Sequence, residues 1–343
     1  MIRRSLAYGL GLIGFAAAAM PTMGKDVVVS TDTIVPTTFE SGHFYAVPEL
    51  TNGKHLRLML DTGGGMSPTI WINQSQADDL GIKVDHDCED DGQTYKAAFP
   101  SFKNGNALPD LSSSCRGIVV LPTSAGGGTD GQIVPSYFRG GVWTFDYPGQ
   151  QVVLRGTAWH PPKDAHSTPL GFKPLPDGTH AGWPRITIDV DGEALSMLLD
   201  TGATAKPTAE ALKEDPRTTT EGITVGSYID ASTMRRWRDK HPDWQVIEKG
   251  DALTTQFTRM IRVPQLEIAG WRVGPVWFIE RPDDAFHSMM AFLMDEAPEG
   301  AVGGNVLEHF RLTIDYKRKA AWFQCVTACS NARSDSHASN SSS

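Results

Sequence analysis

Residues 58–63 read Leu-Met-Leu-Asp-Thr-Gly, and residues 197–202 read Met-Leu-Leu-Asp-Thr-Gly. A second string follows each copy at a distance: residues 144–147 are Thr-Phe-Asp-Tyr, and residues 313–316 are Thr-Ile-Asp-Tyr. One Asp-Thr-Gly carries little information, because turns at strand ends often use these residues for backbone reasons. Two copies, each followed by the same second string, indicate that the chain contains an internal duplication.

The repeated tripeptide predicts two polar loops that meet in space. In each copy the apolar strand would place the aspartate carboxylate in the loop that follows it. The threonine hydroxyl would hold that loop by hydrogen bonds, and the glycine would let a second backbone approach closely. The residues are Asp61, Thr62 and Gly63 in the first copy and Asp200, Thr201 and Gly202 in the second. We therefore expect the two carboxylates to lie side by side across a pseudo-twofold axis.

Short segments of β-type pattern fill most of both copies and predict a mostly β fold. The clearest expected strands cover residues 117–121, 142–145, 185–190, 266–269 and 273–279. The expected helices are few and cover residues 74–80, 208–213, 232–240 and 306–310. Trp71, Trp143 and Trp322 are expected in the core, and Asp146 and Asp315 at strand ends are expected to be structural.

On these residues the chain resembles the aspartic protease family, both its two-lobed pepsin-like enzymes and its retroviral-type proteases. The similarity covers most of the chain and is fuller in the second copy. There residues 200–203, Asp-Thr-Gly-Ala, look like the retroviral-type signature, and residues 301–303, Ala-Val-Gly, look like the apolar-apolar-Gly string beneath the active-site loop. The resemblance implies a mostly β, two-lobed acid-protease fold, pepsin-like or retropepsin-like, with pseudo-twofold symmetry.

The resemblance also implies an aspartic endopeptidase, a hydrolase that cleaves peptide bonds with a water molecule activated between Asp61 and Asp200. Two adjacent carboxyl groups cannot both ionise cheaply, so one would act as base and the other as acid. Thr62 and Thr201 would hold the two loops together, as the interlocked threonines of the family do. The expected substrate is a polypeptide, and neither a cofactor nor a metal ion is expected.

The first copy departs from the family pattern at two places. Gly64 replaces the Ser, Thr or Ala that usually follows the tripeptide, and residues 132–134, Gln-Ile-Val, stand where an apolar-apolar-Gly string is expected. These departures leave open an alternative function, a catalytically impaired protease-like binding or scaffold protein. We favour the enzyme, because both Asp-Thr-Gly strings are intact.

A hairpin flap normally closes such a cleft, and residues 91–106 with Tyr95 are the candidate. The alternative is that Tyr95 is a partly exposed aromatic side chain in a loop.

The N-terminus has the pattern of a secretory signal. Arg3 and Arg4 give it a positive start, residues 6–15 are mostly apolar, and residues 16–19 are four alanines. The expected division of the chain is a signal peptide (1–24), an N-terminal lobe (25–157), an irregular linker (158–184), a C-terminal lobe (185–329) and a disordered tail (330–343). We expect an exported protein, periplasmic or secreted, without a long prosegment.

Composition narrows the choice of partners. The chain has 343 residues and a formal net charge of -9, and it shows no basic patch in its sequence, which argues against nucleic-acid binding. The apolar run near the N-terminus is too short to span a bilayer comfortably, so no stable membrane anchor is expected. We expect a monomer, because the repeat already supplies both halves of the site.

The four cysteines form an even set in a chain that is expected to enter an oxidising compartment. Bridges from Cys88 to Cys115 and from Cys325 to Cys329 are the expected pairing, although free thiols remain an alternative.

Other chemistries lack their minimum parts. The acidic run at residues 85–92 fails the calcium-loop pattern, because Ala98 stands where the closing Glu should be. No His-Glu-x-x-His, Gly-x-Ser-x-Gly or Walker phosphate loop occurs in the sequence.

The exported protein is predicted to begin after residues 16–19, because a signal peptidase accepts small residues behind an apolar stretch. N-terminal sequencing of secreted material checks this. Recovery of an intact Met1 from a membrane fraction would show that the segment is an anchor.

Overall fold

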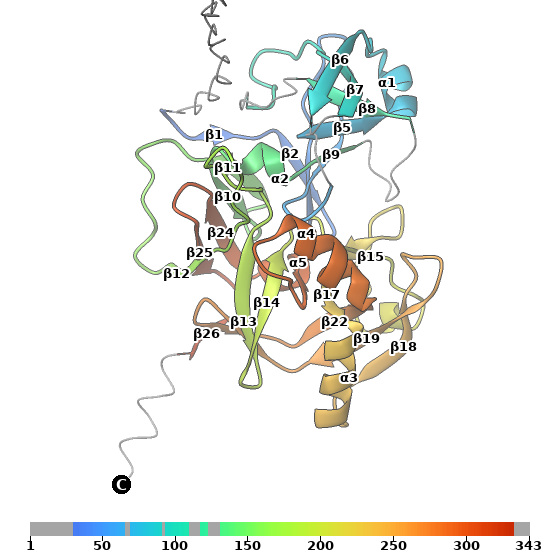
Figure 1. Ribbon diagram of the computed structural model, residues 1–343, viewed down its shortest axis with the longest axis vertical. Coiled ribbons are helices and arrows are strands. Elements are labelled where there is room, and N and C mark those ends of the chain that lie inside the picture. Colours follow the sequence, from blue (N-terminus) through green and yellow to red (C-terminus); the bar gives the residue numbers. More distant parts are fainter. Residues whose placement is uncertain (1–29, 66–68, 91–92, 110–116, 123–130, 333–343) are drawn as a thin grey trace, which may run out of the picture.

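Strands make up most of the described chain, and its helices are short (Figure 1). The computed structural model describes residues 30–65, 69–90, 93–109, 117–122 and 131–332. The first half contains β1 (Thr33–Ile34), β2 (Thr37–Glu40), β3 (His43–Ala46), β4 (Leu58–Leu60), β5 (Ile70–Asn73), α1 (Gln74–Leu80), β6 (His86–Asp90), β7 (Gln93–Ala98), β8 (Ile118–Leu121), β9 (Gly131–Ile133), α2 (Pro135–Phe138), β10 (Val142–Asp146) and β11 (Gln151–Leu154).

The remaining elements follow residue 160. They are β12 (His166–Pro169), β13 (Arg185–Val190), β14 (Glu193–Leu199), β15 (Thr204–Ala205), η1 (Ala211–Lys213), β16 (Thr224–Val225), β17 (Ser227–Asp230), α3 (Ala231–Lys240), β18 (Val246–Asp251), β19 (Thr258–Val263), β20 (Leu266–Ile268), β21 (Trp271–Val273), β22 (Val276–Arg281), η2 (Ala285–Met290), α4 (Ala291–Leu293), β23 (Gly300–Val302), α5 (Gly304–Leu307), β24 (Phe310–Asp315), β25 (Ala320–Cys325) and β26 (Ser330–Asn331).

The two halves have the same strand order. In the first half the order is β3-β4-β9-β5-β8-β7-β6, and in the second it is β13-β14-β23-β17-β22-β19-β18. Directions match as well: β4–β9 and β14–β23 are parallel, β5–β8 and β17–β22 are parallel, and β5–β9 and β17–β23 are antiparallel. The second half adds β20, β21 and β26 beyond β13. The predicted two-lobed acid-protease fold with pseudo-twofold symmetry is therefore confirmed.

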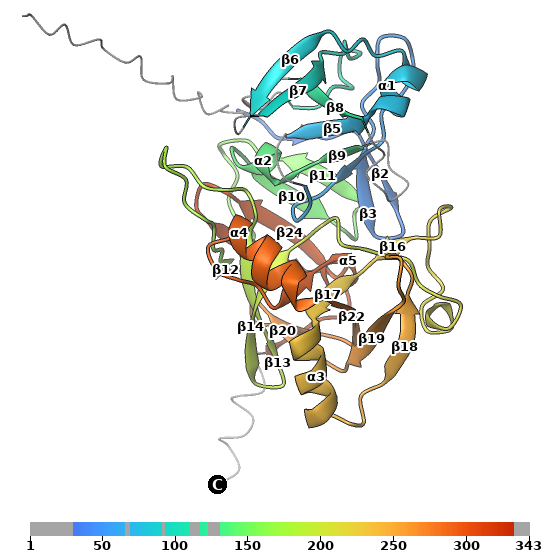
Figure 2. The ribbon, with the colours of Figure 1, turned by 45° about the vertical axis from the view of Figure 1, so that its right-hand side comes forward.

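A six-stranded sheet, β1-β11-β10-β24-β25-β12, joins the two halves. At its centre β10 pairs with β24, and Thr144 lies opposite Thr313 in the antiparallel register. The two hydroxyl oxygens are 2.7 Å apart and buried. The two copies of the second repeated string, residues 144–147 and 313–316, therefore pair where the pseudo-twofold axis crosses this sheet. This point lies between the upper and lower lobes of Figure 2.

Local sequence explains the elements that carry the site. Strand β4 and the last residues of β14 are wholly buried, which is why they are unbroken apolar runs. The β13–β14 hairpin turns at Asp191 and Gly192, with φ of 52° and 80°, the left-handed conformation that Asp-Gly adopts in tight hairpins. Helix α3 begins at Asp230, whose side chain accepts a hydrogen bond from the Thr233 N–H.

One hydrophobic core runs through both halves by way of the shared sheet. Trp143 and Phe145 of β10 belong to the same buried cluster as Leu312 and Ile314 of β24. The lobes therefore cannot separate without exposing this core.

Several expected elements differ from the structure. Only the 3-10 turn η1 forms within residues 208–213, because Pro207 and Pro216 leave a segment too short for a stable helix. The expected helix at 306–310 is instead α5, which ends at Leu307, and Phe310 starts β24 as a buried residue. Residues 273–279 are split between β21 and β22, because Pro275 has no N–H for the strand ladder. Trp322 is half-buried, against the edge of Trp159.

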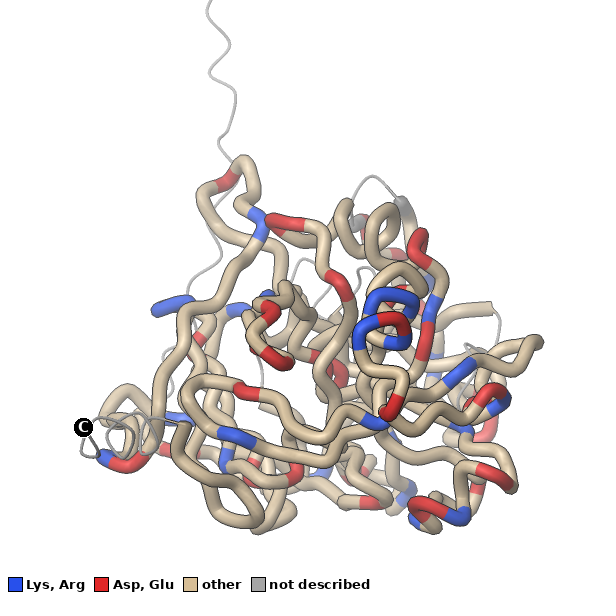
Figure 3. Tube along the Cα trace, turned by 90° about the horizontal axis from the view of Figure 1, so that it is seen from below, with Lys and Arg blue, Asp and Glu red and all other residues tan. Residues whose placement is uncertain are grey.

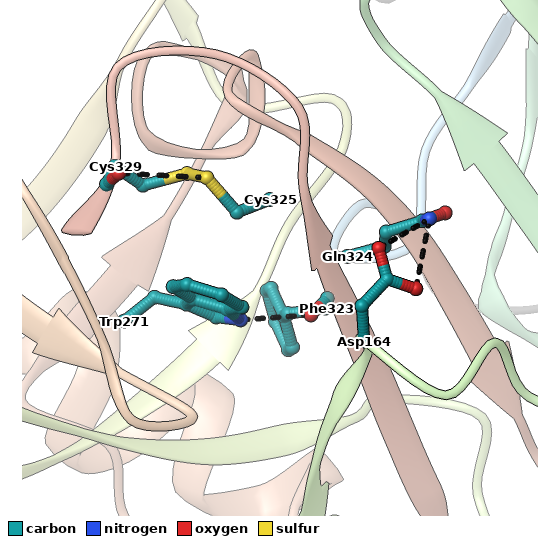
Figure 4. The surroundings of a disulfide bond; sticks show 6 residues. All are labelled: Asp164, Trp271, Phe323, Gln324, Cys325 and Cys329. Carbon is teal, nitrogen blue, oxygen red and sulfur yellow. Dashed lines mark hydrogen bonds between the residues drawn. A yellow bond between two sulfur atoms is a disulfide. The ribbon is translucent and has the colours of Figure 1, made fainter. Parts of the chain in front are cut away.

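The expected linker, residues 158–184, is not wholly irregular, because β12 within it pairs with β25. Figure 4 shows one contact that ties this segment down: the Gln324 side-chain amide donates to both carboxylate oxygens of Asp164, at 3.1 and 3.0 Å. The expected tail from residue 330 was also placed too early, since Ser330–Asn331 forms β26 against β21. Residues 333–343 lie outside the described residues, as does the expected signal peptide, residues 1–24.

The predicted bridge between Cys325 and Cys329 is present, with the two Cα atoms 6.1 Å apart (Figure 4). Beside it the Trp271 indole N–H donates to the Phe323 carbonyl at 2.9 Å, which fastens β21 to β25. The other expected bridge involves Cys115, which lies outside the described residues.

Lys and Arg are interspersed with Asp and Glu over the described chain (Figure 3). Among the residues that the structure describes, no helix is long and apolar enough to cross a membrane.

Candidate active site

The two Asp-Thr-Gly loops meet at the ends of β4 and β14. The Asp61 N–H donates to the Ile133 carbonyl at 2.9 Å, and the Asp200 N–H donates to the Val302 carbonyl at 2.9 Å. Each aspartate is thus held by the last residue of the parallel strand beside it, β9 in one lobe and β23 in the other.

The two threonines bond across the lobe boundary in a reciprocal pattern. The Thr62 hydroxyl donates to the Leu199 carbonyl, and the Thr201 hydroxyl donates to the Leu60 carbonyl, both at 2.7 Å. Each hydroxyl oxygen also accepts the other threonine's N–H, at 3.1 and 3.0 Å. All four bonds are buried, so each threonine satisfies two backbone groups of the opposite loop that water does not reach.

The two glycines allow the close approach. A Cβ atom on Gly63 would lie 2.2 Å from the Asp200 Cγ, and a Cβ atom on Gly202 would lie 2.2 Å from the Asp61 Cγ. Real Cβ atoms do not come this close to other heavy atoms, so only glycine fits either position.

Asp61 and Asp200 are brought together as one buried pair. The two residues are 4% and 7% exposed, and each carboxyl group lies against the glycine of the opposite loop. Burial raises the pKa of both carboxyl groups, since leaving water disfavours the charged form. The negative charge of Asp61 adds to this effect on Asp200, whose pKa lies well above its ordinary value.

The pair is not symmetric, because Asp61 has more donors. Its Oδ1 accepts the N–H groups of Gly63 at 2.9 Å and Gly64 at 2.5 Å, and its Oδ2 accepts the side-chain amide of Gln132 at 3.3 Å. Asp200 accepts the Gly202 N–H at 2.9 Å. Backbone hydrogen bonds from Gly202 and Ala203 offset part of the rise in the pKa of Asp200. Donors favour the charged form, so the surroundings stabilise a charge on Asp61 better than one on Asp200.

The two departures in the first lobe lie together around Asp61. A Cβ atom on Gly64 would lie 2.0 Å from the Asp61 Oδ2, so no side chain fits there in this arrangement. Gln132 occupies the strand position that Ala301 has in the second lobe, and its amide bonds the same oxygen. Val134, at the position of Gly303, packs with Trp71 and Val119.

The expected flap is a hairpin, but its bounds are shifted. Strands β6 and β7 pair from His86–Ala97 to Asp90–Gln93, so the hairpin covers residues 86–98 and not 91–106. Residues 99–106 form a loop with an isolated bridge between Phe102 and Leu50. Tyr95 is half-buried in β7 and packs on the cluster of Trp71, Val119 and Val134. The turn residues 91–92 lie outside the described residues.

The sequence marked Gln132 as a departure from an expected apolar strand, but not as a donor to Asp61. Two further polar residues beside the loops were missed. The Tyr228 hydroxyl donates to the Thr204 carbonyl at 2.5 Å and accepts the Thr204 N–H at 2.7 Å, just beyond Gly202. His43 is fully buried within 3.2 Å of the Thr204 hydroxyl, and burial lowers the pKa of its imidazole to about 4. Nothing in the local sequence marks the last two.

No protein-family model matches the sequence, and no curated protein matches it. Among solved structures, the chain is similar to an aspartic proteinase from Irpex lacteus, with 11% identity, a TM-score of 0.48, and coverage of 87% of this chain and 98% of that one. It is also similar to the basic 7S globulin from soybean, with 12% identity, a TM-score of 0.43, and coverage of 87% of this chain and 95% of that one.

Replacing Thr201 by Val is predicted to destabilise the protein by about 2–5 kcal/mol, because the Leu60 carbonyl and the Thr62 N–H both lose a buried partner. Thr201→Ser keeps the hydroxyl and serves as the matched control. Equilibrium urea unfolding measures both variants. Equal stability of the Val and Ser variants would contradict the cross-lobe lock.

Replacing Gln132 by Leu is predicted to raise the lower of the two apparent pKa values of the pair, by up to about one unit, because the charged Asp61 loses a donor. Carbon-detected NMR titration of the aspartate carboxyl groups measures this without reference to activity. Gln324→Leu, which removes an amide bonded to Asp164, is the control. An unchanged titration in the Gln132 variant would show that this amide does not act on Asp61.

Proposed function

We propose that the chain is an aspartic endopeptidase that hydrolyses peptide bonds with a water molecule activated between Asp61 and Asp200. The observation that carries the proposal is the buried pair of adjacent carboxyl groups on two loops that reciprocal threonine bonds hold together. Burial of two acidic groups side by side is costly to a fold, so such a pair is a strong indication of a chemical role. The substrate would be a polypeptide, and no cofactor takes part.

The unequal surroundings of the two carboxyl groups assign their roles. Asp61, with three hydrogen-bond donors, would take a proton from the bound water as its oxygen attacks the carbonyl carbon. Asp200, with the higher pKa, would donate its proton to the carbonyl oxygen and stabilise the charge that develops there. Collapse of the tetrahedral species then breaks the C–N bond, and a proton passes to the leaving amine nitrogen.

The departures of the first lobe fit this division. Gly64 leaves room for the Asp61 Oδ2, and the Gln132 amide adds a donor to this oxygen that Ala301 of the second lobe cannot supply, which favours the charged form that a base requires. The competing function is that of a protease-like binding or scaffold protein, because Gly64 and Gln132 differ from the residues that are usual in the family at these positions. The two differ in turnover, because a scaffold would bind polypeptides without cleaving them.

An exported enzyme fits the N-terminal signal pattern and the bridge between Cys325 and Cys329. We expect a periplasmic or secreted monomer without a stable membrane anchor.

Asp61→Asn and Asp200→Asn are each predicted to abolish nearly all cleavage of an unfolded protein substrate, because an amide is neither a base nor a proton donor.

Wild-type activity should follow a bell-shaped pH profile on the acid side of neutrality, with limbs that belong to the coupled pair. Cleavage by purified protein across a pH series measures this, with Asp239→Asn, an exposed aspartate of α3, as control.

Stability gives a second readout for the same variants. The pKa of Asp200 is raised, so the folded state binds the Asp200 proton more tightly than the unfolded state does. The protonated Asp200 therefore stabilises the folded state at low pH, and this contribution is lost as the pH rises through the pKa that Asp200 has in the folded state. Asp200→Asn should therefore unfold at no lower temperature than wild type at neutral pH. Substantial activity in either folded Asn variant would refute the two-aspartate mechanism.

A further inference from the structure

A second cluster of potential ligands lies in the C-terminal lobe, outside the Asp-Thr-Gly loops. Asp230, His287 and Glu299 each offer one oxygen or nitrogen atom, and these three atoms all lie within 4.8 Å of one another. They come from the junction of β17 and α3, from η2, and from the residue before β23. Figure 1 shows the helical segment η2–α4 lying next to β17.

Asp230 contributes a buried carboxylate oxygen. Its side chain is 0% exposed, and its Oδ1 accepts the Thr233 N–H at 2.6 Å and the Ser232 hydroxyl at 2.7 Å. Its Oδ2 is buried and has no hydrogen-bond partner among the described residues. A buried carboxylate oxygen that accepts no hydrogen bond is costly, so a further partner such as a cation is to be expected.

His287 faces that oxygen. Its Nε2 is 3.1 Å from the Asp230 Oδ2, yet the contact does not have hydrogen-bond geometry. Two ligand atoms that are each about 2.1 Å from a tetrahedral ion are separated by about 3.4 Å, which is close to this spacing. His287 lies in η2, a π-helical segment, and such segments are frequent at functional sites.

Glu299 completes the cluster and is held in place by its neighbours. Its Oε2 accepts the Thr233 hydroxyl at 2.8 Å and the Arg236 guanidinium at 3.3 Å. Its backbone bonds Ser196 at 2.7 Å and Asp230 at 2.8 Å. Thr233 thus contacts both carboxylates, and ligands oriented in this way are typical of protein metal sites.

We propose that Asp230, His287 and Glu299 bind a divalent transition-metal ion, with Zn²⁺ the best match. One imidazole nitrogen and two carboxylate oxygens suit Zn²⁺ with water in the fourth position, whereas Ca²⁺ and Mg²⁺ prefer oxygen ligands alone. The two carboxylates supply the negative charge, which Arg236 offsets only in part.

The ion would have a structural role in the C-terminal lobe. It would join the start of α3, the η2 segment and the entry to β23, whose Val302 carbonyl receives the Asp200 N–H. Sequence reasoning expected no metal ion, because the three ligands are 57 and 12 positions apart and form no recognised motif.

Calorimetric titration of untagged, chelator-treated protein with Zn²⁺ tests the proposal. The expected result is saturable binding of one ion per chain and a rise in unfolding temperature, with no such response to Mg²⁺. His287→Ala and Glu299→Gln should each weaken binding by more than about tenfold. His160→Ala, which changes an exposed histidine outside the cluster, should bind as wild type does.

Co²⁺ provides an independent readout, since a tetrahedral site with a histidine ligand gives it visible absorption that His287→Ala should abolish. Chelation should lower the unfolding temperature and leave peptidase activity intact at temperatures where the chain stays folded. A failure of the metal-site proposal can therefore be distinguished from a failure of the proposed peptidase function. Absence of saturable Zn²⁺ binding, or unchanged binding in His287→Ala, would show that His287 and Asp230 form an ordinary ion pair.

Discussion

The reciprocal hydrogen bonds of Thr62 and Thr201 are the interaction on which the rest of the structure depends. They bring two loops from different lobes so close that only Gly63 and Gly202 fit beside the opposite carboxylates. This closeness forces Asp61 and Asp200 to share a buried space, and burial raises the pKa of both. The matching strand orders and the shared six-stranded sheet serve to present these two loops to each other.

The duplication of the lobe explains why the two Asp-Thr-Gly loops are symmetric. The residues that differ between the lobes explain why the two carboxyl groups have different surroundings. In the N-terminal lobe, Gln132 adds a donor to Asp61 at the position where the second lobe has Ala301. The Asp61 charge then raises the pKa of Asp200 further. Gln132, a departure from the family pattern, therefore stabilises a charge on Asp61, as the proposed role of base requires. In the C-terminal lobe, the inserted η2 segment brings His287 to Asp230.

The sequence predicted the lobes and the strands that carry Asp61 and Asp200, because fully buried strands are unbroken apolar runs and a duplicated loop repeats its letters. It could not predict Tyr228, His43 or Asp230, whose partners are distant in the chain and are set by tertiary packing. Segment ends were also hard to place: Ser330–Asn331 looks like the start of a polar tail, yet it pairs with β21. The hairpin with Tyr95 was expected to start at residue 91, although the pairing begins at His86.

The central claim is that Asp61 and Asp200 form one site with one shared proton. Neutron diffraction from a deuterated crystal at about pH 3, where one such carboxyl is expected to stay protonated, tests this most directly. The account predicts carboxyl oxygens within hydrogen-bonding distance and a single deuteron between them, bound to Asp200. Carboxyl groups too far apart to share a deuteron, or a pair with both members ionised at that pH, would contradict it.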